Sequence, residues 1–149
     1  MDSNNLSRIN TDLYKKFLGF LTKKGNICKA KRILDLTFSI VSKKTKSSTH
    51  AALVTLFCKL NSFVEVKKVR VRRRFVLVPF PICAKRRSYL IVKWIMQATK
   101  KVKRKRPFSE KLSRELINIL KGSPCLTKRF RQLNFSAALA NRSNTHFRW

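Results

Sequence analysis

The sequence predicts a mainly α-helical protein, in which a single six-helix domain carries a projecting two-stranded β-hairpin between its third and fourth helices. The length of 149 residues suits one domain. Leu, Ile, Val and Phe make up 47 of these residues, which is enough for a packed core. Apolar residues recur at helical spacing except in one central stretch, where they alternate with other residues. We divide the chain into a short N-terminal arm (1–10), a helical domain (11–141) and a basic, aromatic C-terminal tail (142–149).

Three helices are expected before the centre of the chain. The first begins near Asp12, with Thr11 as its cap. The second has an apolar stripe over 33–41, and a polar loop follows it at 42–49. The third repeats the same apolar spacing over 52–60. Because each helix has one apolar face, we expect all three to pack around a common core.

Residues 63–82 are expected to form the β-hairpin. Apolar and charged residues alternate in its first strand, with a slip in phase at Lys67-Lys68, and every second residue is apolar in its second strand. The turn falls near Arg72-Arg73, without the glycine that is typical of tight hairpin turns. Two prolines in the second strand cannot donate to a ladder, so this strand must lie at an edge or project from the body.

Helical spacing returns after the hairpin. The fourth helix has its apolar face over 90–102. The fifth begins near Pro107 and ends at Gly122. The sixth has Thr127 as its cap and an apolar stripe over 130–140.

Composition excludes several classes of protein. The longest apolar run, 75–84, has ten residues and contains two prolines, so no membrane-spanning helix is expected. The N-terminus resembles neither a secretory signal nor an arginine-rich presequence. No Cys-x-x-Cys pair is present, and we expect the cysteines to be buried small residues in a reducing compartment, rather than metal ligands or disulfides. They are Cys28, Cys58, Cys83 and Cys125.

Residues suited to catalysis are few. His50 and His146 have no carboxylate nearby in the sequence, so each is expected to be structural or to face a phosphate. Glu110 and Glu115 are five residues apart and are expected on the surface of the fifth helix. The remaining acids are scattered, and three glycines are too few for a glycine-rich phosphate loop. We therefore expect a protein that is not an enzyme and that needs neither a cofactor nor a metal.

Positive charge dominates the sequence. Lys and Arg number 36 against 6 Asp and Glu, which gives a formal net charge of +30. Self-repulsion on this scale opposes a compact state, so the expected partner is a polyanion that supplies counter-charge. The basic residues cluster on the hairpin (67–74), before and after the fourth helix (85–87 and 100–106) and near the C-terminus (128–148). One such cluster would suit a solvated surface, but four of them predict nucleic-acid binding.

The spread of these clusters favours a folded RNA over linear duplex DNA. The strands lack an aromatic base-stacking motif, so contacts with phosphates and with RNA shape are expected to outweigh base reading. Phe147 and Arg148-Trp149 could stack on bases or could anchor the tail in the core of the protein, and both possibilities stay open at this point.

Several short strings, taken in order, resemble the universal small-subunit ribosomal protein seven family, of bacterial and organellar type. The strings are Val64-Glu65-Val66-Lys67, Val78-Pro79, Arg86-Arg87, Lys93-Trp94, Ser109-Glu110-Lys111-Leu112, Ala140-Asn141-Arg142 and His146-Phe147-Arg148-Trp149. Each string is weak alone, but their order over residues 11–149 is specific. The sequence departs from the family at the reduced N-terminal arm, at Asn26-Ile27 and at Arg72-Arg73, where the family has basic residues, Lys-Lys and Gly-Gly respectively.

The resemblance implies a structural protein that binds the 3′ major domain of small-subunit ribosomal RNA and organises the head of the subunit. Its hairpin would lie near the messenger RNA exit and the exit-site transfer RNA, and its other partners would be neighbouring head proteins. The expected RNA-binding residues are Lys23, Lys24, Lys29, Arg32, Lys67, Lys68, Arg70, Arg72, Arg73, Arg74, Lys85, Arg86, Arg87, Lys100, Lys101, Lys103, Arg104, Lys105, Arg106, Lys128, Arg129, Arg131, Asn141, Arg142, His146 and Arg148.

Composition rich in Phe and Lys and poor in Gly favours a mitochondrial copy, with a plastid or the bacterial cytoplasm as the alternative. Two other functions are weighed against the ribosomal one. The first is an architectural DNA-binding protein that inserts the hairpin into a groove, which would need an apolar wedge where this tip has arginine. The second is a nuclease that uses His50 and His146 as an acid–base pair.

Overall fold

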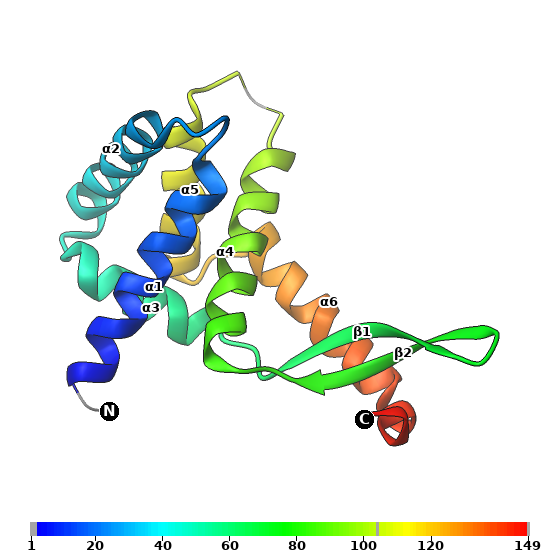
Figure 1. Ribbon diagram of the computed structural model, residues 1–149. Helices are drawn as coiled ribbons and strands as arrows, with labels where there is room; N and C mark the ends of the chain where they lie inside the picture. Colours follow the sequence, from blue (N-terminus) through cyan, green and yellow to red (C-terminus); the bar gives the residue numbers. More distant parts are fainter. Residues whose placement is uncertain (1–2, 104, 149) are drawn as a thin grey trace.

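The computed structural model describes residues 3–103 and 105–148, and a long β-hairpin projects from one end of its helical body (Figure 1). In chain order, the elements are α1 (Ser3–Leu21), α2 (Ile27–Thr45), α3 (Thr49–Leu60), β1 (Val64–Val71), β2 (Arg74–Pro81), α4 (Ala84–Lys101), α5 (Phe108–Lys121), α6 (Leu126–Ala140) and the 3-10 helix η1 (Arg142–Phe147). The predicted fold class, six α-helices with a hairpin between the third and fourth, is confirmed.

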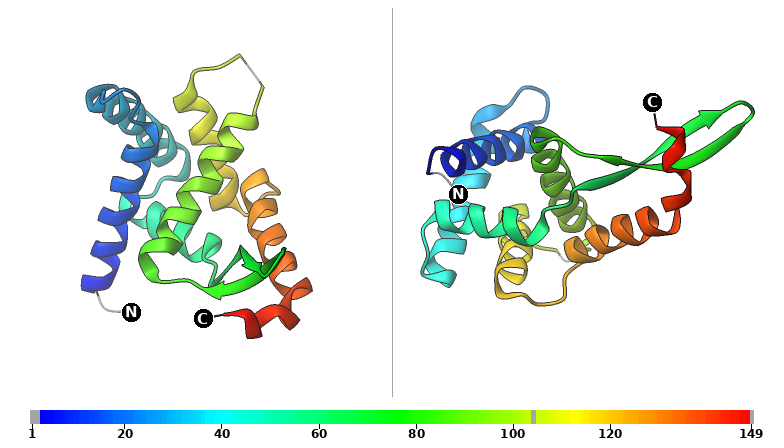
Figure 2. Two further views of the ribbon diagram at one scale, coloured as in Figure 1. Left: turned by 45° about the vertical axis from the view of Figure 1, so that its right-hand side comes forward. Right: turned by 90° about the horizontal axis from the view of Figure 1, so that it is seen from below.

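The helices α4 and α5 form the centre of the body (Figure 2). α4 contacts α1, α3, α5 and α6, while α2 and α3 pack on α5. The predicted apolar face of α4 is buried here, and Ile91, Val92, Ile95 and Ala98 are each at most 1% exposed. Burying one isoleucine side chain contributes roughly 1.5–3 kcal/mol relative to leaving it exposed. This core therefore opposes the mutual repulsion of the surface cations.

The first helix begins at Ser3, well before the predicted start, and Thr11 lies inside it instead of capping it. Leu6, Ile9 and Leu13 are spaced by three and by four residues, so the helical period runs back through the segment that was expected to be an arm.

Side chains cap α2 and α3 at their N-termini. Oδ1 of Asn26 accepts a hydrogen bond from the backbone N–H of Lys29 (3.4 Å), and Oγ of Ser48 accepts one from Ala51 (3.2 Å). Both bonds satisfy N–H groups that have no partner within their own helix.

The predicted loop at 42–49 is largely wrong, because α2 continues to Thr45. The hydroxyl of Ser42 donates to the carbonyl of Ser39 (3.1 Å), and that of Thr45 donates to the carbonyl of Val41 (2.8 Å). These bonds to the preceding turn let polar residues remain helical.

The two strands pair without interruption from Val64 opposite Pro81 to Val71 opposite Arg74. β1 is continuous through Lys67-Lys68, so the predicted slip in phase there moves the apolar residues from one face of the strand to the other. The turn is the predicted Arg72-Arg73, and Arg72 adopts a left-handed backbone with φ of 54°. Each strand of a two-stranded sheet is an edge strand, which is why β2 tolerates its prolines, as predicted.

The N-terminus of α6 is capped by a carboxylate from α5, not by the predicted Thr127. Oε1 of Glu115 accepts hydrogen bonds from the backbone N–H (3.1 Å) and the hydroxyl (2.6 Å) of Thr127. Glu115 is only 7% exposed, so its predicted surface position is wrong. A carboxylate at this position satisfies an otherwise unpaired N–H and interacts favourably with the helix dipole.

The apolar stripe predicted for α6 is only partly buried. Thr127 and Ala138 are the buried residues of this helix. Leu133 and Leu139 are more than half exposed, and so is Phe135. α6 packs by one narrow edge against α4 and β1, which leaves most of its apolar surface open.

The cysteines differ from the prediction in their exposure. Cys28, Cys58 and Cys83 are exposed, Cys125 is half-buried, and all four are free thiols. Within the described residues, no group of three His, Cys, Asp or Glu side chains is placed to hold a metal ion. In the same part of the chain, no helix is both long and apolar enough to cross a membrane.

The cap supplied by Glu115 generates a prediction about stability. Glu115→Ala is expected to lower the free energy of unfolding by about 1–3 kcal/mol, because it leaves the buried N–H and hydroxyl of Thr127 without an acceptor. The control is Glu110→Ala, which removes only exposed ion pairs and should cost less than about 1 kcal/mol. Urea unfolding in high salt measures both, and equal losses would contradict the capping role.

The left-handed residue in the turn generates a second prediction. Arg72→Gly is expected to raise the free energy of unfolding by about 1 kcal/mol, because glycine adopts this backbone conformation without a Cβ clash. Arg73→Gly removes the same charge at the neighbouring turn position, whose φ is not positive, and should not stabilise the chain. Equal changes of the urea midpoint in the two variants would show that the lost charge, and not relief of backbone strain, alters the stability.

Candidate nucleic-acid interface

The predicted RNA-binding residues gather at two ends of the molecule and on α6. The first group, the helical-end cluster, lies at the end of the body away from the hairpin, where the α1–α2 and α4–α5 connections meet solvent (Figures 1 and 2). Its members are Lys23, Lys24, Lys29, Arg32, Lys100, Lys101, Lys103, Lys105 and Arg106, all exposed. Arg104 lies outside the described residues.

The second group, the hairpin-end cluster, lies on the hairpin, on the first turn of α4 and on the tail. Its members are Lys67, Lys68, Arg70, Arg72, Arg73, Arg74, Lys85, Arg86, Arg87, Asn141, Arg142, His146 and Arg148. Lys128, Arg129 and Arg131 form the third group, on the first turns of α6. The helical body thus lies between the helical-end cluster and the hairpin-end cluster, whereas in the sequence their residues are only successive runs.

Arg86 has a partner within the chain. Its Nε and Nη2 atoms donate to the two carboxylate oxygens of Glu65 at 2.9 and 2.7 Å, and its guanidinium lies over the ring of Tyr89. This hydrogen-bonded pairing lowers the pKa of Glu65, although burial opposes the shift, and the same bond raises the pKa of Arg86. The bond joins the base of β1 to the start of α4.

Arg87 is also held internally. Its Nε donates to the carbonyl of Ile82 (3.1 Å), and its guanidinium lies 4.6 Å from the centre of the Phe63 ring. Positive charge at the start of a helix opposes the helix dipole, so Lys85, Arg86 and Arg87 at the start of α4 suit an external anion. For Arg86 and Arg87 the structure supplies internal partners instead, and in the described chain only Lys85 of the three has none.

The tail lies along β2 and is bonded to it. Nδ2 of Asn144 donates to the carbonyl of Leu77 (3.1 Å), and Nε of Arg148 donates to that of Pro79 (2.5 Å). Nδ2 of Asn141 donates to the carbonyl of Ala137 (2.8 Å) and so closes the end of α6. Arg148 therefore anchors the tail on the hairpin, and not in the core of the protein, since η1 contains no buried residue. Trp149 lies outside the described residues.

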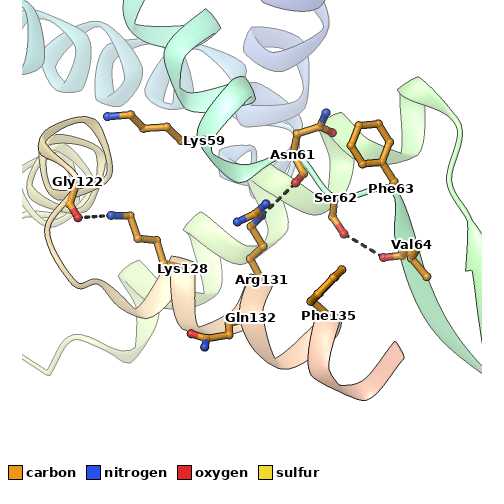
Figure 3. Close-up of a pocket in the computed structure, with 10 residues that line it drawn as sticks. All are labelled: Lys59, Asn61, Ser62, Phe63, Val64, Gly122, Lys128, Arg131, Gln132 and Phe135. Atoms are coloured by element: carbon orange, nitrogen blue, oxygen red, sulfur yellow. Dashed lines mark hydrogen bonds between the residues drawn. The ribbon is translucent and has the colours of Figure 1, made fainter. Parts of the chain in front are cut away.

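A groove of about 600 Å³ separates the end of α3 and the start of β1 from α6 (Figure 3). Arg131 donates from Nε to the carbonyl of Asn61 (3.0 Å), while Lys128 donates to the carbonyls of Gly122 and Ser123. Lys59 donates to the carbonyl of Leu120 from the opposite wall. These cations satisfy carbonyls at helix C-termini, where positive charge is favourable.

Three polar residues that position the interface were not recognised in the sequence. They are Lys59, Asn134 and Asn144, and each donates from its side chain to a backbone carbonyl. Asn134 on α6 reaches the carbonyl of Val64 at 2.7 Å and so holds the start of β1. None of the three carries a local signal of this role, because each accepting carbonyl belongs to another element of the fold.

The two histidines do not form a pair. His50 lies in the first turn of α3 and His146 lies in η1, and these elements are on opposite sides of the molecule (Figure 1). Nδ1 of His146 is 2.8 Å from the carbonyl of Ser143, and its ring packs on Phe147. The acid–base pair that a nuclease would need is therefore not assembled.

Exposed cations held in fixed positions on a helical body and a hairpin define a nucleic-acid-binding protein of structural type. Comparison with known proteins gives the family. Residues 2–142 match the family model described as ribosomal protein S7p/S5e, and the chain belongs to this family. It is therefore a structural, non-enzymatic ribosomal protein, as the sequence predicted.

Similar proteins occur in bacteria and in an animal. The small ribosomal subunit protein uS7 of Thermosipho melanesiensis is 30% identical over 94% of this chain and 89% of its own length. That of Borreliella afzelii is 30% identical over 96% of this chain and 90% of its own length. The small ribosomal subunit protein uS7m of Drosophila melanogaster is 27% identical over 93% of this chain and 69% of its own length.

The lowered pKa of Glu65 generates a prediction about pH. A carboxylate whose pKa is depressed by folding adds stability above its ordinary pKa of 4.5, and this stability is lost as the pH falls through the folded-state pKa. Glu65→Gln should therefore be less stable than the unsubstituted chain at pH 7, by at most about 1 kcal/mol because Arg86 is well exposed. The two urea midpoints should converge below pH 4.5. A difference that persists unchanged to low pH would contradict this role.

Proposed function

We propose that the chain is a structural constituent of the small ribosomal subunit that binds the 3′ major domain of its ribosomal RNA and organises the head. Membership of the ribosomal protein S7p/S5e family and the names of its bacterial relatives support this proposal. The two cationic ends of the body would hold separate segments of the folded RNA at a fixed spacing. We propose that all the residues of the three groups, together with Arg104, contact this RNA.

One observation carries the proposal. The three acids that follow Asp35 are all engaged within the chain: Glu65 by Arg86, Glu110 by Arg106 and Arg114, and Glu115 by Thr127. The chain has a formal net charge of +30, so its cationic surfaces receive almost no counter-charge from its own side chains. A dense polyanion supplies that charge, and each phosphate contact releases a bound counterion.

The position of the hairpin supports further partners. It projects from the body with an arginine-rich tip, which suits a place beside other RNA strands, and we propose messenger RNA and the exit-site transfer RNA as those strands (Figure 2). Neighbouring proteins of the head would cover the remaining surface. We propose a mitochondrial ribosome as the location on the basis of composition and of the relative uS7m, while the bacterial relatives of similar identity keep the bacterial cytoplasm or a plastid as the alternative.

One feature of the hairpin favours a second candidate, an architectural DNA-binding protein. Phe75, next to the turn, is 71% exposed and is the kind of apolar wedge that enters a minor groove. Competition between duplex DNA and the ribosomal RNA domain separates the candidates. A ribosomal role predicts that the RNA displaces the DNA, and that a tagged copy sediments with small subunits in high-magnesium buffer.

The helical-end cluster generates a prediction about salt dependence. If six to ten cations meet phosphates, affinity for the ribosomal RNA domain should fall about 10³- to 10⁵-fold between 50 and 200 mM salt. The double variant Lys100→Ala with Lys103→Ala should lower the slope of log affinity against log salt by about two, one for each lost phosphate contact. Filter binding over this range of salt measures the slope.

The matched control removes two exposed lysines outside the proposed site. Lys43→Ala with Lys44→Ala, at the end of α2, changes net charge by the same amount and should leave the slope within about half a unit. An equal decrease in both double variants would show that total charge, and not the helical-end cluster, governs binding.

A further inference from the structure

An open hollow of about 680 Å³ lies between the tip of the hairpin and the C-terminal tail. Its lining residues are Val71, Arg72, Arg73, Arg74, Val76 and Phe147. Val71 lies directly opposite Arg74 in the ladder, and Val76 follows two residues later, so these side chains share one face of the hairpin. The hollow therefore combines an apolar surface, from two valines and a phenylalanine, with three exposed arginines.

The Phe147 ring is held in place before any ligand arrives. Asn144 and Arg148, on either side of it in sequence, are hydrogen-bonded to carbonyls of β2. The ring is half-buried and packs on His146, with 3.9 Å between the ring centres. Because the ring is already ordered, binding a ligand against it costs little further conformational entropy.

The arginines of the tip lack internal partners. Among the described residues, the guanidinium groups of Arg72, Arg73 and Arg74 make no hydrogen bond or ion pair. A purely apolar ligand would leave these charges uncompensated. A base-paired duplex would offer phosphates, but its base faces are stacked and cannot reach the ring. An unpaired nucleotide in a single strand offers both a planar face and adjacent phosphates.

We propose that this hollow binds an unpaired base of a single-stranded RNA, which stacks on Phe147 while Arg72, Arg73 and Arg74 contact the neighbouring phosphates. The inference rests on the proposed function, since it assumes that the chain works among RNA strands. It assigns a base-stacking role to Phe147 alone, while Arg148 anchors the tail that carries it. The strand could be messenger RNA or a loop of the ribosomal RNA itself.

The experiment uses the full chain and two fluorescent RNA octamers. One is an octamer of adenosine, and the other has the same phosphates but abasic sites in place of the bases. Phe147→Ala should weaken binding of the adenosine octamer about 5- to 150-fold, the range of one lost base–aromatic stack, and should barely change binding of the abasic octamer. Phe147→Trp keeps an aromatic face and should retain the affinity.

The matched control is Phe75→Ala. Phe75 is an exposed phenylalanine of the same hairpin, but it lies between Arg74 and Val76 and so points to the opposite face. This variant should leave the affinity for both octamers unchanged. Retained binding of the ribosomal RNA domain, measured for every variant, shows that each one is folded and keeps its phosphate contacts.

The outcomes separate this inference from the proposed function. If Phe147→Ala binds both octamers as the unsubstituted chain does, or loses both equally, the stacking site is disproved while the ribosomal role stands. If Phe75→Ala loses as much as Phe147→Ala, the site is also disproved. Failure of the unsubstituted chain to bind the ribosomal RNA domain would instead overturn the proposed function.

A final arm identifies the source of the strand. The adenosine octamer is titrated into the chain already bound to the ribosomal RNA domain. Binding that still depends on Phe147 assigns the hollow to a strand from outside that domain, such as messenger RNA. Loss of octamer binding in the complex, with Phe147 still required in the free chain, assigns the hollow to the ribosomal RNA.

Discussion

A shortage of carboxylates governs how this chain is held together. Ion pairs join the base of the hairpin to α4 through Glu65, and the start of α5 to the preceding connection through Glu110. Glu115 is buried and holds α6 on α5 by hydrogen bonds. Exposed pairs of this kind contribute little each, whereas a buried acceptor is costly to remove. These three acids thus stand at junctions between elements, where one interaction fixes a relative orientation.

Backbone carbonyls take over much of the role that acids have in less basic proteins. In the part of the chain that the structure describes, six Lys or Arg side chains donate to carbonyls, and three bond to carboxylates. A carbonyl fixes a cation in place without neutralising it, since the carbonyl carries no net charge. Arg87, Arg131 and Arg148 are therefore positioned by the fold and remain positive. Each of these residues can therefore hold two elements of the fold together and still offer its positive charge to RNA.

The sequence was informative where one local pattern decided the structure. The hairpin, the apolar face of α4 and the end of α5 at Gly122 follow from period and turn chemistry. The length of α2 and the cap of α6 did not, because a hydroxyl bonded to its own helix and a carboxylate reaching from another helix leave no mark on local spacing. The start of α1 does leave such a mark, in the spacing of Leu6, Ile9 and Leu13. Composition indicated the cations of the candidate interface, but not which of them Glu65 or a backbone carbonyl would hold.

The hairpin shows why these distant contacts matter. A two-stranded hairpin alone is marginally stable in water, and this one carries repelling arginines at its tip. Three parts of the chain hold it instead: α4 through Arg86, α6 through Asn134, and the C-terminal tail through Asn144 and Arg148. These contacts lie on the strands away from the turn, at Val64, Glu65, Leu77 and Pro79. In the described chain, the one side-chain hydrogen bond to the turn comes from Arg70, which donates to the carbonyl of Arg72. Because these contacts fix the strands without RNA, binding of RNA to the hairpin would order only its tip. More of the interaction free energy would then remain as affinity.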